Sequence, residues 1–210
     1  MFFGTFADAR HAIGDEVTSV GTAFEEARLF PDDAPKIHHA LICYSRAVSE
    51  FDFPALRRGE SAPEADIAYR NIILALGEAE GSTDGTFQPA AATNIFAQVG
   101  NISTARETRL VAAENQVPST MWILLFGGGL LVVSLIFVVT VPARPATQAV
   151  LVGLVALFTG LMIVIVVVLA FPFAEGAGRV TPALIDQTTA YMESAAPDAA
   201  ALPCEFDQQS

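Results

Sequence analysis

The chain has 210 residues, of which 52% are hydrophobic and 16% are charged, whereas soluble domains carry roughly 25% charged residues. Its net charge of −12 and its single lysine, Lys36, exclude nucleic acid as a partner and also a polybasic attachment to anionic lipid, because both need clustered Lys and Arg. The charge deficit is uneven: from Gln116 to Ala174 the one charged residue is Arg144.

Residues 6 to 117 show the apolar periodicity of helices and no strand pattern. One long amphipathic helix is predicted first, and charges such as Glu16 are expected to fall mostly off its apolar stripe. Asp32 and Asp33, after Pro31, break this helix and supply a cap for the next. The stripe consists of Phe6, Ala9, Ile13, Val17, Val20, Phe24 and Ala27.

A second helix is expected to stop before Pro54, where proline removes a backbone donor. A capping-box spacing at Ser61 to Glu64 then starts a third helix, which a loop at residues 81–85 ends. The apolar positions of the second helix are Ile37, Leu41, Tyr44, Val48 and Phe51, and those of the third include Ile67, Ile72 and Leu76.

A fourth helix begins near Pro89 and runs almost to the membrane, interrupted by Pro118. Its apolar phase slips between Ile102 and Leu110, around two arginines. Four helices with short connections predict an antiparallel helical bundle over residues 1–118.

Residues 119–172 are predicted to form a transmembrane hairpin with helices at about 121–141 and 149–170. Neither run contains a charge, and they hold 14 and 15 Leu, Ile, Phe and Val residues. A helix of this length spans a hydrocarbon core of about 30 Å. On a translocon-insertion scale the apolar side chains contribute roughly −4 to −9 kcal/mol per helix. A chain this short cannot bury two such helices on every side, so the lipid bilayer is the expected partner.

Two prolines, Pro142 and Pro145, flank the link between these helices and make them antiparallel neighbours. In the second hairpin helix, small residues lie along one face. In the first hairpin helix, two more small residues lie seven positions apart. Such residues let helix backbones approach closely in lipid, either within the hairpin or between subunits of a homo-oligomer. They are Gly127, Ser134, Ala149, Gly153, Ala156 and Gly160.

After the hairpin, residues 173–194 are predicted to include a short helix that begins at Thr181 and Pro182. The alanine- and proline-rich end, residues 195–210, is expected to be disordered. Cys43 and Cys204 lie far apart in the sequence and show no metal-ligand spacing, so both are expected to be free thiols.

A series of short segments is spread along the chain, at residues 6–10, 59–61, 105–110, 117–118, 122, 171–173 and 179–182. In this order and spacing, they resemble the bestrophin-like membrane proteins, a family whose domain has no established function. The resemblance covers about residues 6–194. It implies two membrane helices before the helical domain and two after it, of which this chain shows only the latter pair. An anion-channel role, with small anions as ligands, is implied only by distant resemblance to bestrophins.

The apolar start of the chain, at Phe2 and Phe3, continues the phase of the first helix. These residues are interpreted as the stub of a membrane helix lying upstream, in which case the reading frame is a shortened one. An inert fragment from a misplaced start codon is therefore kept as a third and weaker hypothesis.

No catalytic, cofactor or metal site is predicted. His38 and His39 are adjacent, so on a helix they point about 100° apart and do not chelate as an i, i+4 pair would. His11 stands alone among charged residues. No Ser/His/Asp set and no phosphate-binding loop is present, so an enzyme is not expected.

Four arginines are interpreted as charges at the membrane interface: Arg106, Arg109, Arg144 and Arg179. They either anchor the chain and pair with lipid phosphates or attract anions to a pore mouth. Three lie on the domain side and one in the turn, so the positive-inside rule favours a cytoplasmic bundle and C-terminus. The plasma membrane is the expected location.

Two functions remain open at this point. The resemblance favours an oligomeric membrane protein that forms part of an anion-conducting pore. The uncharged hairpin favours a membrane-anchored helical bundle that acts as a sensor, scaffold or partner-binding module without conduction, because ionisable residues within a membrane usually mark transport paths.

Overall fold

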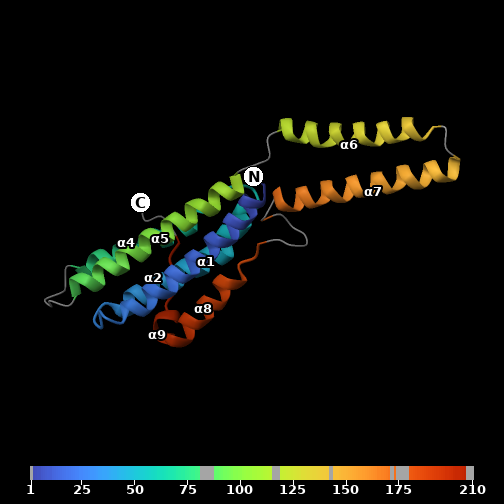
Figure 1. Cartoon of the computed structure of the whole chain (residues 1–210). Helices are drawn as coiled ribbons and strands as arrows, with labels where there is room; N and C mark the ends of the chain where they lie inside the picture. The colour runs from blue at the N-terminus through green and yellow to red at the C-terminus, as the bar shows by residue number, and fades with distance from the viewer. Residues whose placement is uncertain are drawn as a thin grey trace. The chain divides into compact units, whose positions relative to one another are not determined.

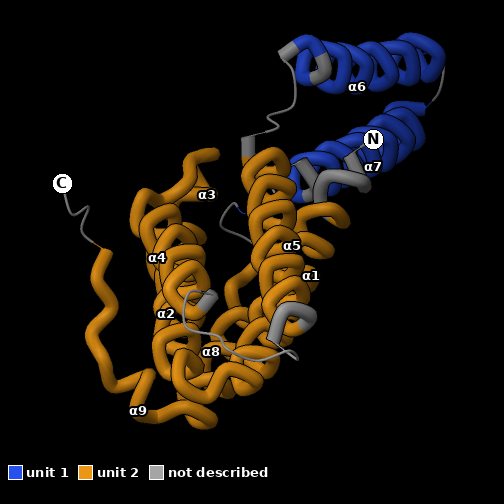
Figure 2. Tube along the Cα trace, turned by 90° about the vertical axis from the view of Figure 1, so that its left-hand side faces the viewer, with its two compact units in different colours: residues 1–6, 115–179 blue, residues 7–114, 180–210 orange. Residues whose placement is uncertain are grey.

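The structure, a computed structural model, describes residues 2–80, 88–114, 119–141, 144–170, 173 and 180–206. All regular elements in these ranges are helices (Figure 1), so the all-helical prediction is confirmed. Contacts divide the chain into two compact units (Figure 2). The hairpin unit comprises residues 1–6 and 115–179, and the helical unit comprises residues 7–114 and 180–210.

The helical unit is a bundle of long helices that run side by side (Figures 1 and 2). Its amphipathic helices bury the faces that the sequence predicts, including Ile13 and Phe24 in the first predicted helix and Ile72 in the third. Its elements are α1 (Phe2–Ala27), α2 (Ala34–Ala47), η1 (Val48–Asp52), α3 (Phe53–Leu56), α4 (Pro63–Glu80), α5 (Gln88–Glu114), α8 (Ala183–Ala195) and α9 (Pro197–Ala200).

The second predicted helix does not stop before Pro54 but continues through it to Leu56. A five-residue π-helical turn, η1, precedes the proline, and the Phe53 N–H bonds the Val48 carbonyl five residues back. Proline has no N–H to offer the regular ladder, and a π turn re-phases the helix at that point. The turn leaves Asp52 fully buried.

The phase slip predicted in α5 is absent. The buried face continues from Ile102 through Ala105 and Arg109 to Ala112. The apolar pattern is interrupted in the sequence because a core position of α5 is held by an arginine, Arg109, in place of an apolar residue.

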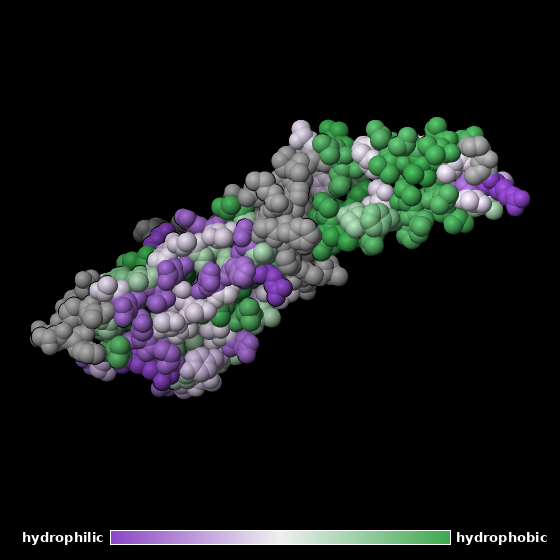
Figure 3. Space-filling model, in the orientation of Figure 1, coloured by the Kyte–Doolittle hydropathy of each residue, from purple (hydrophilic) through white to green (hydrophobic). Residues whose placement is uncertain are grey.

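The hairpin unit consists of α6 (Ser119–Thr140) and α7 (Pro145–Ala170). Both contain stretches apolar and long enough to cross a membrane, 122–140 and 145–168, and neither stretch is buried by the rest of the chain. Figure 3 shows an almost uniformly hydrophobic surface over these two helices, in contrast to the mixed surface of the helical unit. Side chains this apolar on all sides are stable in lipid and not in water.

The two helices meet along a seam of half-exposed residues that recur every three or four positions, as in left-handed helix pairs. Gly129 is the point of closest approach, because a Cβ atom added there would lie 2.9 Å from Thr159 Cγ2. At the turn end the Gln148 side-chain amide donates to the Phe137 carbonyl at 3.4 Å. The seam consists of Trp122, Leu125, Gly129, Val133, Ile136 and Thr140 in α6, and Gln148, Val152, Val155, Thr159, Ile163 and Val166 in α7.

Helix α7 begins at Pro145, four residues before the predicted start. Proline is favoured in the first turn of a helix, where its missing N–H costs nothing, so Pro145 starts the second helix and does not belong to the link. The predicted loop at residues 81–85, together with Pro118 and Pro142, lies outside the described residues.

The chain after residue 195 is ordered as far as the structure describes it, up to residue 206, which corrects the expected disordered tail. Pro197–Ala200 forms α9, and the segment beyond it runs along the bundle. The composition that predicted disorder is overridden by specific bonds to α2, described below.

Candidate functional site

The most unusual feature of the helical unit is a set of charges buried in its core, which we call the ionic cluster: Glu16, Tyr44, Asp52 and Arg109. The Arg109 guanidinium donates to Glu16 Oε2 at 2.7 Å from Nη1 and to Asp52 Oδ2 from Nη2. The side chains of Arg109 and Asp52 are completely buried and that of Glu16 is 1% exposed. Buried charges are found where they are paired and hydrogen-bonded, and this arrangement satisfies that condition.

Each carboxylate of the cluster also binds a second group, so the cluster joins four elements. Glu16 Oε1 accepts the Tyr44 hydroxyl at 2.5 Å, which links α1 to α2. Asp52 Oδ1 accepts the Ala62 N–H at 2.9 Å, just before α4. A carboxylate there also compensates the positive end of the α4 helix dipole. The guanidinium of Arg109, in α5, lies 5.5 Å from the Phe53 ring centre.

Burial sets the protonation behaviour of the cluster. Desolvation raises the pKa of Glu16, against the opposing attraction of Arg109. Desolvation, reinforced by the charge of Glu16, raises the pKa of Tyr44 well above its usual value. Burial alone would lower the pKa of Arg109, but the nearby acidic groups outweigh it and the pKa is raised, so Arg109 stays charged.

The cluster is closed to ligands. The cavity beside Glu16 and Tyr44 measures about 10 Å³, which is at most the room that one water molecule needs. No substrate therefore reaches these groups, and the arrangement functions as an internal connection between helices.

Two of the four predicted interface arginines lie in the bundle core, which corrects their interpretation as charges facing lipid. Arg109 belongs to the ionic cluster, and Arg106 pairs with Asp66 and is 9% exposed. Both charges are neutralised by carboxylates of the same unit. Arg144 is exposed next to the turn, and Arg179 lies outside the described residues.

The six small residues predicted to mediate packing all lie outside the α6–α7 seam, and all are exposed. Added Cβ atoms at Gly127, Gly153 and Gly160 would meet nothing within 4 Å. The glycine that the hairpin requires is Gly129, which the pattern of small residues does not single out. Packing within the hairpin is thus not the use of these six residues, and packing between subunits stays a prediction.

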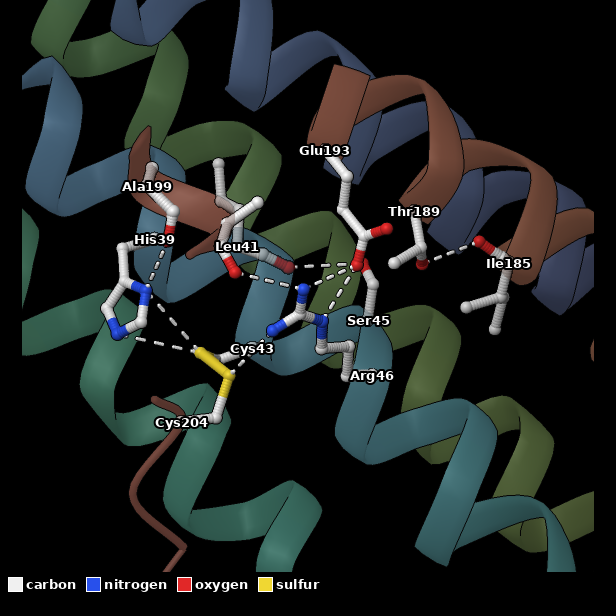
Figure 4. A network of polar contacts seen from close by, with 11 residues as sticks. His39, Leu41, Cys43, Ser45, Arg46, Ile185, Thr189, Glu193, Ala199 and Cys204 are labelled. Atoms are coloured by element: carbon white, nitrogen blue, oxygen red, sulfur yellow. Dashed lines mark hydrogen bonds and ion pairs between the residues drawn. A yellow bond between two sulfur atoms is a disulfide. The ribbon is translucent and has the colours of Figure 1, made fainter. Parts of the chain in front are cut away.

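A second connected set of residues binds the C-terminal segment, residues 196–206, to α2 (Figure 4). Cys43 and Cys204 form a disulfide with their Cα atoms 5.5 Å apart. His39 Nδ1 donates to the Ala199 carbonyl at 2.9 Å, and Arg46 Nη2 donates to the Ala200 carbonyl at 3.1 Å. Arg46 also pairs with Glu193 of α8 at 2.6 Å.

The disulfide corrects the expectation of two free thiols. The two cysteines are 161 residues apart in sequence, and pairing cannot be deduced from sequence alone. The number of cysteines is the one feature of the sequence that allows the disulfide, since a chain with two cysteines can form one intramolecular disulfide.

Two open cavities lie on the helical unit. One, of about 510 Å³, runs between α1 and α5 and is lined by polar residues such as Asp8, Asp15 and Thr104. The other, of about 540 Å³, lies beside the disulfide between α2, α4 and the C-terminal segment. Among the described residues, no group of three or more His, Cys, Asp and Glu side chains is arranged to hold a metal ion.

His38 makes the stability of the helical unit depend on pH, and a substitution can isolate this contribution. Its Nε2 donates to the Phe24 carbonyl at 2.9 Å, and its ring stacks on the Phe24 ring at 4.0 Å. Burial lowers the pKa of His38. The unfolded chain therefore takes up a proton near pH 6.5, before the folded protein does, and stability falls as the pH drops below that value.

The test compares the wild type with His38→Gln, whose side-chain amide keeps the donor to Phe24. Denaturant midpoints measured between about pH 7.5 and pH 5 should converge as the pH falls, because only the wild type loses this contribution. A constant difference between the two proteins across that range would contradict the assignment.

A helical bundle followed by a hairpin of two unburied apolar helices defines an all-helical membrane protein. The family model of the bestrophin-like domain matches residues 3–184, and the chain therefore belongs to the bestrophin-like family. The family resemblance inferred from the sequence is confirmed.

The fold is also similar to a solved structure, the crystal structure of a point mutant of a bacterial bestrophin homolog from Klebsiella pneumoniae. The TM-score is 0.73 and the sequence identity is 15%, over 96% of this chain and 80% of that one. A search of the curated proteins found no match.

Proposed function

We propose that this chain is a multi-pass protein of the plasma membrane that assembles into a homo-oligomer and forms part of an anion-conducting pore, with no enzymatic activity. The observation that carries the proposal is the match of the bestrophin-like domain over residues 3–184, together with a fold similar to that of a bacterial bestrophin homolog. The described residues of α6 and α7 include no charged side chain. Any pore that these helices line is therefore gated by a hydrophobic constriction, not by a charged ring.

A second candidate is a membrane-anchored helical bundle that senses a ligand or binds a partner without conduction. The pairing of Arg106 and Arg109 with carboxylates favours it, because neither arginine is left to attract anions. The open groove between α1 and α5 also gives such a module a surface on which to bind.

Chloride efflux from liposomes separates the two candidates. The full chain and a version extended upstream in the same reading frame are reconstituted at matched protein-to-lipid ratios. The channel proposal expects chloride efflux well above that of empty liposomes from at least one of them. Efflux at the empty-liposome level from both would rule out conduction and leave the non-conducting module.

Oligomer formation is expected to depend on the small residues of α7 that are exposed and lie outside the α6–α7 seam. Gly153→Leu should reduce the oligomer to smaller species, because a large side chain keeps neighbouring helices apart. Native mass spectrometry in detergent measures the effect. Gly128→Leu is the matched control, since it adds the same side chain to an exposed glycine outside the proposed face. Equal oligomers from both variants and the wild type would contradict this interface.

The helical unit and the C-terminus are proposed to face the cytoplasm, with Arg144 next to the outer turn. The support is the excess of arginines on the domain side. Impermeant maleimide applied to intact cells should label Ala146→Cys in a Cys43→Ser, Cys204→Ser background. If this cysteine is protected and the cysteine of a Ser61→Cys variant is labelled instead, the helical unit faces the outside and the proposed orientation is wrong.

A further inference from the structure

One face of α2 holds the C-terminal segment through three residues. His39, Cys43 and Arg46 are spaced four and three apart, so their side chains leave the helix on the same side. His39 binds Ala199, Arg46 binds Ala200, and Cys43 is bonded to Cys204 (Figure 4). The disulfide is the single covalent link in this set. The hydrogen bonds beside it, which include one from Arg46 Nη1 to Cys204 Sγ at 3.7 Å, are individually weak.

The disulfide lies beside open space. The cavity of about 540 Å³ next to it is lined by Cys43, His39, Leu202 and Pro203 among others. This volume is within the range of small-molecule sites, roughly 300–1,000 Å³. A small thiol can therefore approach the disulfide without unfolding the bundle.

The two cysteines differ in exposure, and their sulfur atoms differ in their neighbours. Cys43 is 5% exposed, whereas Cys204 is half-buried. Both ring nitrogens of His39 lie near Cys43 Sγ, Nε2 at 3.6 Å and Nδ1 at 3.7 Å. Because the Ala199 carbonyl can only accept, Nδ1 carries a proton, and Nε2 is left to interact with the sulfur. When Nε2 also carries a proton, the imidazolium donates to a thiolate on Cys43 and stabilises it.

From these observations we infer that the Cys43–Cys204 disulfide is a site of thiol–disulfide exchange with a dithiol, and that this exchange fastens and releases the C-terminal segment. A thiolate of the dithiol attacks Cys204 Sγ, the sulfur of the more exposed cysteine. The sulfur–sulfur bond breaks, and its electron pair leaves on Cys43 Sγ beside His39, where a proton is taken up.

The second thiol of the reductant then completes the exchange. As a thiolate it attacks the reductant's own sulfur in the mixed disulfide, and Cys204 is released and protonated by water. The dithiol has lost two electrons and two protons and become a disulfide, and the protein disulfide has become two thiols. Disulfides in reducing compartments are usually transient and redox-sensing, so the exchange suits the cytoplasmic location proposed above but does not depend on it.

Release of the segment is measured by hydrogen exchange of the full chain in detergent, before and after reduction with dithiothreitol and alkylation. The Ala200 and Ala201 amides, which bond to the Ala196 and Pro197 carbonyls at 3.0 Å, report on α9. Their exchange should rise by about tenfold or more when the covalent link is lost, while the core of α4 stays unchanged. Cys204→Ser should reproduce the effect without reductant. Unchanged exchange in both experiments would overturn the fastening role.

The chemistry is tested by the rate at which dithiothreitol reduces the protein, followed by the appearance of two alkylated thiols. His39→Gln keeps an amide donor for Ala199 but removes the stabilisation of the leaving sulfur. Its reduction should be about three- to tenfold slower. His11→Ala, at an exposed histidine of α1, is the matched control and should react like the wild type.

Two results would refute the exchange site itself. One is an equal reduction rate for His39→Gln and the wild type, which would remove His39 from the reaction. The other is trapping of both cysteines as free thiols in cells under oxidising as well as reducing growth conditions, which would mean that the bond does not form.

Discussion

Arg109→Met is expected to destabilise the helical unit by about 3–5 kcal/mol, because it leaves buried carboxylates without their cation. Glu16 and Asp52 have almost no contact with solvent, and both depend on the Arg109 guanidinium. Methionine restores most of the volume, so the loss reports the charge and not a cavity. Urea unfolding followed by far-ultraviolet circular dichroism, at constant detergent, measures the change.

Two controls make this result specific. Arg28→Met removes an arginine whose ion pair with Glu25 is about half exposed, and exposed pairs contribute about 1 kcal/mol or less. Combining Arg109→Met with Glu16→Gln and Asp52→Asn removes the orphaned charges and should recover part of the loss. A triple variant less stable than Arg109→Met alone would contradict the ion-pair explanation.

Gly129→Leu is expected to separate α6 from α7 and to cost about 3 kcal/mol, at the upper end of overpacking effects. A Cβ atom there would already lie 2.9 Å from Thr159 Cγ2, on a β-branched side chain that cannot turn away freely. Titration with sodium dodecyl sulfate measures the effect through the fluorescence of Trp122, the single tryptophan, at the end of the seam.

The neighbouring glycine provides the control for this prediction. Gly128→Leu adds the same side chain where a Cβ atom meets nothing within 4 Å, and should leave the detergent midpoint unchanged. Thr159→Gly introduced into Gly129→Leu opens space opposite the new side chain and should restore part of the stability. Equal effects of Gly128→Leu and Gly129→Leu would refute the seam.

The architecture could be predicted from periodicity because burial of apolar side chains decides it. Helices α1, α2 and α4 bury their apolar stripes in the core of the helical unit. The two uncharged helices of the hairpin are not buried by the rest of the chain, as their composition predicts. The start of α7 at Pro145 was missed by four residues, since proline both ends and begins helices.

The sequence does not predict the ionic cluster, because charged side chains are expected at the surface of a protein. Three charged residues lie on the buried faces of their helices: Glu16 between Ile13 and Val20, Asp52 between Val48 and Leu56, and Arg109 between Ile102 and Ala112. Their positions were visible in the sequence, and the apparent phase slip in α5 marked one of them. The pairing between three separate helices was not visible, because it depends on how the helices pack.

The disulfide and the ordered C-terminal segment could not be predicted for a related reason. The bonds of residues 199, 200 and 204 are made with α2, more than 150 residues earlier, so local composition carries no trace of them. The same holds for Gly129, whose importance follows from its place opposite Thr159 and not from its type.

The membrane hairpin is tested most directly by fractionation of cells that express the full chain. We expect the protein to remain in the membrane pellet after an alkaline carbonate wash and to enter solution only with detergent, because α6 and α7 present apolar side chains on every face. A folded, monodisperse monomer recovered from the aqueous extract without detergent would contradict the account.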